Sequence, residues 1–197
     1  MSIRGPGRPP GTTHDEIRDI ALGLFLVRGY AKTSLASIAH AAGISRTTLF
    51  SYFPSKRELI WEEHDQRAAE IETAMDDGPA RPVVDMIVRG LLVSARYGVD
   101  EHAVLAARLR VVEQDDELRA FAALAVKDTT KRVSEGAARR APNADPRLID
   151  LVTRALVAAA SQCTEEWASQ EQPTSNLDVH TSHGIRVIVD ALRPLLP

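Results

Sequence analysis

Apolar residues recur every three or four positions along most of this chain, which is the spacing of one face of an α-helix. The first such stretch follows Thr13-His14-Asp15-Glu16, a capping-box sequence, and Gly29 is placed to end the helix. Two shorter helices are predicted next, from about Ser34 to Ala42 and from about Arg46 to Phe53. The glycine-containing break at residues 43–45 separates them.

The same spacing predicts six further helices and no β-strand. A second capping box, residues 55–58, opens a helix that continues toward Met75, and residues 76–79 form the clearest break in the chain. Pro82 and Pro146 suit first helical positions, with Asp145 as a cap. The later helices are predicted at 82–97, 101–112, 116–140, 146–170 and 177–193. The chain is therefore expected to be all-α, with about nine helices.

Composition and helix spacing together divide the chain into three parts. Residues 1–12 are rich in Gly and Pro and are expected to form a flexible basic arm. Residues 13–58 are predicted to form a compact three-helix unit. Residues 59–197 are predicted to form a larger helical part.

The break at residues 43–45 has the properties of a tight turn between two short helices that cross at a steep angle. Ala39 is small enough for close helix approach, Gly43 tolerates a positive φ, and Ile44 and Leu49 can fill the space between the helices. Hydrogen-bonding side chains then remain on the outer side of the second helix, where they suit base edges and phosphates in a major groove.

The residues of this segment resemble the TetR family of bacterial regulators. The similarity runs from about Ile17 to Leu59 and includes Gly29-Tyr30, Thr33, Ile38-Ala39, Ala42-Gly43-Ile44-Ser45, Thr48-Leu49-Phe50, Tyr52-Phe53 and Ser55-Lys56. The resemblance implies that residues 13–58 are a helix-turn-helix DNA-binding domain and that residues 59–197 are a helical ligand-binding and dimerisation domain. It covers less than a quarter of the chain.

The resemblance also implies which side chains contact DNA. Helix 46–53 would be the recognition helix, with its first residues on bases and Lys56 on a phosphate at the start of the next helix. Phe50 stands where the family usually has Tyr, and we expect it only to pack because it lacks the hydroxyl group. The expected DNA-contacting residues of this unit are Ser34, Ser45, Arg46, Thr47, Thr48, Ser51, Tyr52 and Lys56.

The arm offers a second DNA contact. Gly7-Arg8-Pro9 resembles the core of an AT-hook, in which an arginine lies in a narrow minor groove. Arg8 is therefore a candidate DNA-binding residue. A tail attracted to DNA by charge alone is the alternative.

The distribution of charge supports a DNA-binding head. The whole chain carries −3, which by itself argues against a nucleic-acid ligand. Residues 1–60, however, hold eight Lys/Arg and four Asp/Glu, so that segment carries +4 and the rest of the chain −7. A basic head on an acidic body is the pattern expected for phosphate attraction at one end.

Two apolar stripes near the C-terminus are candidates for a homodimer interface. The family usually dimerises through its last two long helices, which pack into a four-helix bundle. Both stripes could also face their own monomer's core, and a shared role is favoured. The stripe residues are Leu148, Leu151, Val152, Ala155, Leu156, Ala159 and Cys163 on one helix, and Ile185, Ile188, Val189 and Leu192 on the other.

An effector pocket is expected among the helices between these two regions. Its mostly apolar lining indicates a small hydrophobic effector, for which a fatty acyl thioester and another lipophilic molecule are both suitable. Core packing explains most of the apolar members equally well. The candidate ligand-binding residues are Trp61, His64, Met86, Leu91, Tyr97, His102, Leu105, Leu109, Phe121, Leu124, Thr129, Gln162, Glu166 and Trp167.

Other chemistry has little support in the sequence. His180 and His183 are three residues apart, but no Cys or carboxylate completes a metal set of recognisable spacing, so we expect no metal and no cofactor other than the effector. Cys163, the only cysteine, is expected to be buried. The chain has no signal-like or membrane-spanning apolar run, so a cytoplasmic location is expected.

Three functional hypotheses follow. The favoured one is a ligand-responsive repressor that binds a palindromic operator as a homodimer. An enzyme on a helical scaffold is the second, but no nucleophile motif or phosphate loop supports it. The third is an architectural protein that binds DNA without sequence preference, which the acidic body disfavours.

Overall fold

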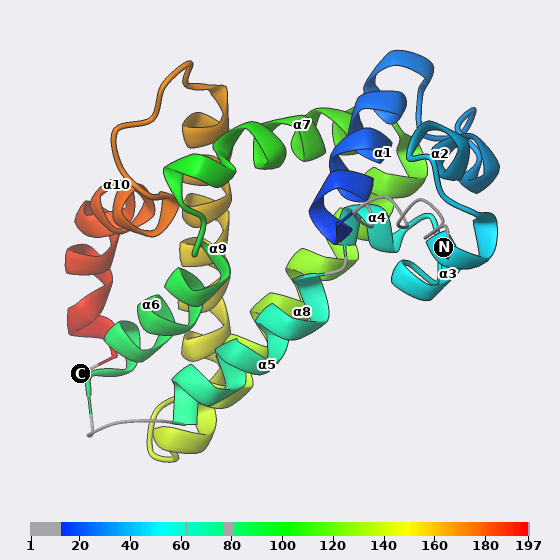
Figure 1. The fold of residues 1–197 in the computed structure, drawn as a ribbon. Helices are drawn as coiled ribbons and strands as arrows, with labels where there is room; N and C mark the ends of the chain where they lie inside the picture. Colours follow the sequence, from blue (N-terminus) through cyan, green and yellow to red (C-terminus); the bar gives the residue numbers. More distant parts are fainter. Residues whose placement is uncertain (1–12, 62, 77–80, 197) are drawn as a thin grey trace, which may run out of the picture. The chain divides into compact units, whose positions relative to one another are not determined.

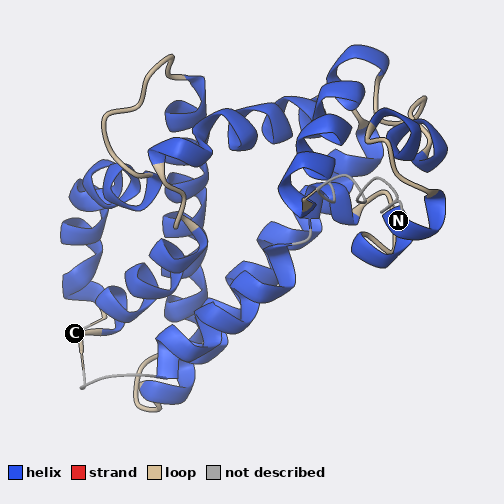
Figure 2. Cartoon of the chain, in the orientation of Figure 1, coloured by secondary structure: helices blue, strands red, loops and turns tan. Residues whose placement is uncertain are grey.

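A computed structural model describes residues 13–61, 63–76 and 81–196, with side chains except for those of residues 63–66. All regular secondary structure in these ranges is helical (Figure 1 and Figure 2), as the apolar spacing predicted. The chain divides into two compact units, residues 1–61 and residues 62–197.

The described residues of the first unit form four helices. They are α1 (His14–Arg28), α2 (Leu35–Ala41), α3 (Arg46–Tyr52) and α4 (Glu58–Trp61). The predicted capping box of α1 is confirmed in Thr13 and Glu16. The helices α2 and α3 are also capped, because the Ser34 and Ser45 hydroxyls accept the backbone N–H of Ser37 and Thr48. Each cap satisfies an N–H group that the first helical turn leaves without a partner.

The turn between α2 and α3 depends on a left-handed residue. Gly43 has φ +66°, and the following Ile44 N–H donates to the Ala39 carbonyl oxygen at 3.0 Å. A side chain at a φ of this kind is strained even where space is available, and a Cβ atom at Gly43 would meet nothing within 4 Å. The turn is therefore specified by backbone conformation and not by crowding.

The part of the second unit that the structure describes has six α-helices and two short 3-10 helices. Pro82 is the N-cap of α6 and not its first residue, because its ψ of 142° is extended. The elements are α5 (Glu63–Asp76), α6 (Val83–Ser94), η1 (Val99–Glu101), α7 (His102–Glu113), α8 (Asp116–Arg140), α9 (Pro146–Ser169), α10 (Leu177–Leu192) and η2 (Arg193–Leu195).

The predicted helix from residue 55 to Met75 corresponds to α4 and α5, which flank Glu62, a residue outside the described ranges. α4 begins at Glu58, three residues after the predicted start. In the second capping box, the Ser55 hydroxyl donates to the Glu58 carboxylate at 3.0 Å and accepts the Glu58 N–H at 3.4 Å.

Most of the second unit packs around one apolar core that α5, α6, α8, α9 and α10 share. Met75 of α5 lies where α6 and α8 both carry glycine: a Cβ at Gly90 would be 2.6 Å from its sulfur, and one at Gly136 would be 3.0 Å from its Cβ. Two glycines thus let three helices approach around one thioether side chain. No described helix is long and apolar enough to cross a membrane.

We expect Gly43→Ala and Gly23→Ala to have opposite effects on the first unit. Gly43→Ala should lower its stability by about 1–2 kcal/mol because alanine is strained at positive φ. Gly23 lies within α1, where an added Cβ would meet nothing within 4 Å, so Gly23→Ala should raise stability by about 0.5–1 kcal/mol. Hydrogen exchange of peptides from residues 13–61 measures both; equal effects would contradict the conformational argument.

Candidate nucleic-acid interface

The buried side of α3 holds the helix against the first unit. Leu49, on α3, and Phe53, its C-cap, are both fully buried, and Ile38 and Ala39 of α2 are buried with them. Ile44 and Leu49 were both expected to fill the space between α2 and α3. Leu49 is buried, whereas Ile44 is only half-buried. This packing leaves the opposite side of α3 to solvent.

Four residues share the outward face of α3. Arg46, Thr47, Phe50 and Ser51 are all exposed, and their positions within the helix span about 140° of its circumference. Hereafter, the outward face means these four residues. The expectation that Phe50 only packs is wrong, because 41% of its surface is exposed. Its spacing of four from Arg46 could have indicated this.

Thr48 and Tyr52 lie on a neighbouring flank of α3. The Thr48 hydroxyl is 2.8 Å from the Ser45 hydroxyl, which also accepts the Thr48 N–H at 3.0 Å. The Tyr52 ring is exposed but lies 5.8 Å from the ring of His14, which is itself 4.2 Å from the Phe53 ring. The His14 contact links the start of α1 to the end of α3, and the sequence did not indicate it.

The Ser34 and Ser51 hydroxyls also have intramolecular partners. Ser34 Oγ accepts the Ser37 N–H at 3.1 Å, and Ser51 Oγ donates to the Thr48 carbonyl oxygen at 2.7 Å. Both residues are exposed, so each oxygen can still accept a further hydrogen bond. Their DNA contacts stay predictions.

Lys56 has a structural role that the sequence did not reveal. Its ammonium group donates to the carbonyl oxygens of Tyr30, at 2.8 Å, and Thr33, at 3.2 Å, and it lies 3.9 Å from the centre of the Tyr30 ring. These contacts secure the loop between α1 and α2 against the segment before α4. An ammonium group has three donors, so one remains for a phosphate.

The predicted effector residues fall into several groups in the second unit. Tyr97, Leu105, Leu109 and Trp167 come together in one small apolar cluster with Ala95 and Leu177, which we call the Trp167 cluster. Met86 and Leu91 instead belong to the large core, and Gln162 is exposed and donates to Glu166 at 3.2 Å. Phe121 and Thr129 are half-buried on α8. Trp61 belongs to the first unit, and the His64 side chain is outside the described residues.

The Trp167 cluster has a polar edge. His102 lies edge-on to Trp167, with 4.9 Å between ring centres, and its Nε2 is 3.2 Å from the Trp167 carbonyl oxygen. The Arg67 guanidinium lies 3.9 Å from the centre of the Tyr97 ring, and Arg108 donates to the Tyr97 hydroxyl at 2.5 Å. The two arginines were not among the predicted ligand residues because Arg67 of α5 and Arg108 of α7 reach Tyr97, in the segment after α6, only through the fold.

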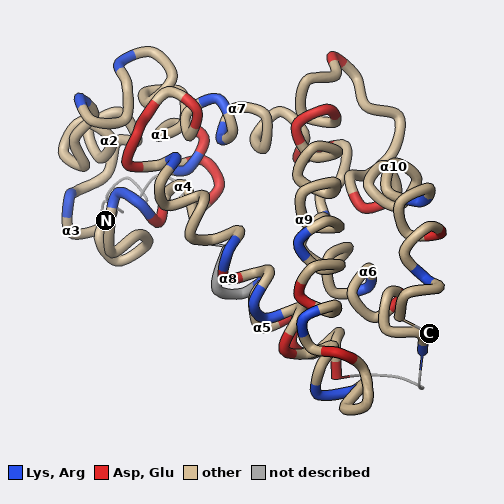
Figure 3. Tube along the Cα trace, turned by 180° about the vertical axis from the view of Figure 1, so that it is seen from behind, with Lys and Arg blue, Asp and Glu red and all other residues tan. Residues whose placement is uncertain are grey.

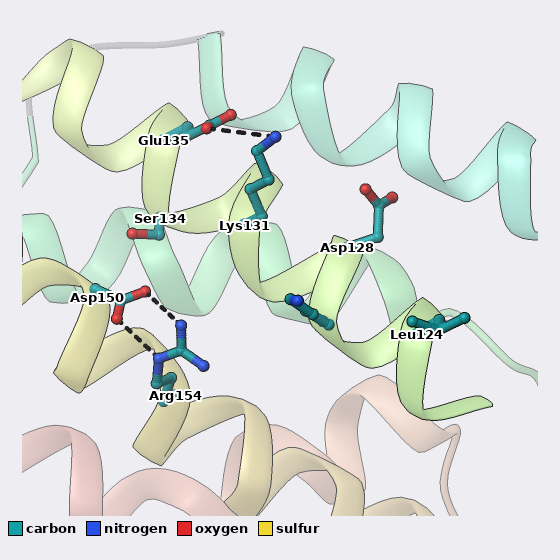
Figure 4. A pocket seen from close by; sticks show the side chains of 8 residues that line it. Leu124, Asp128, Lys131, Ser134, Glu135, Asp150 and Arg154 are labelled. Atoms are coloured by element: carbon teal, nitrogen blue, oxygen red, sulfur yellow. Dashed lines mark hydrogen bonds and ion pairs between the residues drawn. The ribbon is translucent and has the colours of Figure 1, made fainter. Parts of the chain in front are cut away.

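Leu124 lies apart from that cluster, in an open groove between α8 and α9 (Figure 4). The groove is lined mainly by charged side chains, and Asp150 accepts from Arg154 at 2.8 and 3.2 Å. The hydrogen bond and charge of Asp150 raise the pKa of Arg154. The tube view shows Lys/Arg and Asp/Glu positions recurring along both helices (Figure 3). A charged groove differs from the apolar lining expected for the effector.

The C-terminal stripes divide between core and surface. Val152, Leu156, Cys163, Ile185 and Val189 are buried in the large core. Leu148, Ala159 and Leu192 are half-buried against it, whereas Leu151, Ala155 and Ile188 are exposed.

Burial raises the pKa of the Cys163 thiol, and the negative charge of Glu166 adds to the effect. Among the side chains described, no three His, Cys, Asp or Glu residues group to hold a metal.

Two models of known protein families match this chain, one in its N-terminal part and one in its C-terminal part. Residues 17–62 match the family model described as bacterial regulatory proteins of the tetR family, and residues 81–193 match the model of the MftR C-terminal domain. The chain belongs to the TetR family. Members of this family are DNA-binding transcriptional regulators and not enzymes. This TetR-family protein is likewise a DNA-binding transcriptional regulator and not an enzyme.

Individual relatives extend over most of the chain. A putative mycofactocin biosynthesis transcriptional regulator, MftR of Mycobacterium tuberculosis, is 28% identical over 167 residues, which cover 84% of each chain. The fatty acid degradation regulator FadR of Bacillus halodurans has the same fold, with a TM-score of 0.59 at 18% identity, covering 92% of this chain and 100% of that one. FadR of Thermus thermophilus, solved in complex with lauroyl-CoA, has a TM-score of 0.52 at 21% identity and covers 90% and 93%.

We expect Lys56→Met to destabilise the first unit of this TetR-family protein. The substitution removes two hydrogen bonds from a charged donor, at a cost of about 1–2 kcal/mol. Lys32 is exposed in the loop before α2, so Lys32→Met serves as the control and should change stability by less than about 0.5 kcal/mol. Hydrogen exchange of residues 13–61 measures both variants, and an unchanged Lys56→Met protein would exclude the structural role.

Proposed function

We propose that this protein is a ligand-responsive repressor, which binds a palindromic operator as a homodimer and is released by a small hydrophobic effector. The observation that carries the proposal is the outward face of α3. Its polar side chains are exposed, while Leu49 and Phe53 pack the opposite side of the helix into the first unit. A short helix presented in this way fits the major groove of DNA.

The proposed DNA contacts divide by chemistry. Arg46, Thr47 and Ser51 donate or accept hydrogen bonds at base edges, while Thr48 and Tyr52 approach from the flank. Ser34, Ser45 and the remaining donor of Lys56 bind phosphates and set the register of the helix. Arg8 in the minor groove completes the interface, although it lies outside the described residues.

The homodimer is proposed to form through the exposed faces of α9 and α10. On α9, Leu151 is 63% exposed, and Ala155 and Ala158 lie on the same side. On α10, Val187 is 77% exposed, beside exposed Ile188. Water-facing apolar side chains on two adjoining helices, flanked by small residues, suit packing against a second copy. Val187 was absent from the predicted stripe.

We expect the double substitution Leu151→Glu and Val187→Glu to give a monomer with a folded core. Both side chains are exposed, so the substitutions leave the monomer's interior intact but place charges in the dimer interface. Sedimentation measures the mass, and circular dichroism checks the fold. Val27 on α1 is exposed as well, and Val27→Glu should stay dimeric. A double variant that remains a dimer would place the interface elsewhere.

The Trp167 cluster is the proposed effector region. It combines apolar side chains with the His102 ring, and Arg67 and Arg108 contact Tyr97 at its polar edge. A fatty acyl thioester has both an apolar chain and an anionic head, and the FadR structure with lauroyl-CoA is a fold neighbour that binds one. Effector binding would change the spacing of the two recognition helices, which must enter successive major grooves about 34–36 Å apart.

Selection of bound sequences from a random DNA pool tests the proposal. We expect a palindromic sequence to be enriched, and lauroyl-CoA to weaken binding to it. Thr47→Ala should lower affinity for the enriched DNA by about tenfold, the effect of losing one base contact, with little change on random DNA. Affinities are measured by mobility shift at several salt concentrations, since phosphate contacts alone weaken steeply with salt.

The matched control is Thr73→Ala, an exposed threonine on α5 outside the recognition unit. It should bind both DNAs as the unmodified protein does. If no sequence is enriched, or if Thr47→Ala loses affinity equally for enriched and random DNA, sequence-specific reading by α3 is excluded.

A further inference from the structure

Phe50 occupies the middle of the outward face of α3. It is four residues from Arg46 and three from Thr47, so both lie beside it on the helix surface, and Ser51 follows on the same side. It is the one apolar side chain among the four. Its 41% exposure keeps a large aromatic ring in water in the free protein.

Packing of the first unit does not account for this position. The buried side of α3 is filled by Leu49 and Phe53, which are completely covered. An exposed ring contributes little to the core, and a polar residue would be expected there if solvent were its only neighbour. The ring is therefore available to a surface that approaches the outward face.

Major-groove chemistry limits what such a ring can recognise. Guanine, cytosine and adenine present hydrogen-bond donors and acceptors in this groove, to which a phenyl ring can offer neither. Thymine alone among the four standard bases presents a methyl group, and apolar side chains contact it. A tyrosine at position 50 could form a hydrogen bond through its hydroxyl group. The phenylalanine side chain has no hydrogen-bonding group.

We infer that Phe50 is a specificity-determining residue that contacts the 5-methyl group of a thymine in each half-site. Arg46 and Thr47, on either side of it, form hydrogen bonds to the adjacent bases, so the outward face reads a thymine with polar contacts around it. This inference rests on the proposed function, because it requires α3 to lie in the major groove.

Replacement of thymine by deoxyuridine tests the contact directly. Deoxyuridine pairs as thymine does and lacks only the 5-methyl group. Each thymine of the enriched DNA is replaced in turn, and affinity is measured for the unmodified protein and for Phe50→Ala. One thymine per half-site should weaken binding of the unmodified protein roughly fourfold, the effect of uncovering one methyl group. The same replacement should leave the affinity of Phe50→Ala unchanged.

Two further variants make the result specific. Phe50→Leu retains an apolar side chain and should retain sensitivity to the same deoxyuridine, and Val27→Ala, at an exposed apolar site on α1, should behave as the unmodified protein. Circular dichroism checks that Phe50→Ala folds, as its exposure leads us to expect; if it does not, the Phe50→Leu and Phe50→Ser pair supplies the comparison.

The outcomes separate the inference from the proposed function. If a sequence is enriched but no deoxyuridine position depends on residue 50, Phe50 does not read a thymine methyl group, and α3 still binds DNA specifically. If Phe50→Ala weakens all DNAs alike, the ring contacts the sugar-phosphate backbone and the inference is overturned. If no sequence is enriched, both fail.

Discussion

The left-handed turn at Gly43 is the constraint on which the placement of α3 and its outward face depends. Its positive φ reverses the chain within a few residues, and the Ile44 N–H to Ala39 carbonyl bond closes the turn. Ser45 then caps α3, so Arg46 begins the helix at a defined angle to α2. With Leu49 turned inward, helical periodicity places the outward face in solvent. A different backbone at one residue would reorient every side chain that follows.

The two units of the chain are stabilised by different kinds of contact. The first unit is small, so its few buried side chains are supplemented by caps, by the Lys56 contacts to two carbonyl oxygens and by the stacking of His14 on Phe53. The second unit is larger and relies on helix packing around Met75, with glycines where α6 and α8 approach it.

Local signals in the sequence predicted most of the fold. The capping box at Thr13 and Glu16, the glycine at 43, and Asp145-Pro146 each act within a few residues, and each has the predicted structure. Periodicity located the long helices to within a few residues. Pro82 differed, because its place as N-cap and not as first helical residue depends on a single backbone angle.

The candidate sites were harder to predict, since they depend on contacts between distant parts of the chain. The spacing of Val152 and Leu151 gives both residues an apolar helical pattern, yet only the packing of α8 and α10 shows that one is buried and the other exposed. Likewise, Arg67 and Arg108 meet at Tyr97 from different helices. The exposure of Phe50 depends on how α3 packs against α2, which the sequence does not show.

Within α3, the residues that hold the helix and those that face outward do not overlap. Gly43, Leu49 and Phe53 maintain the structure, whereas Arg46, Thr47, Phe50 and Ser51 contribute little to its interior. Substitutions at the second set can accumulate during evolution without unfolding the protein. After gene duplication, such a regulator could acquire a new target sequence through a handful of surface changes while its scaffold stays intact.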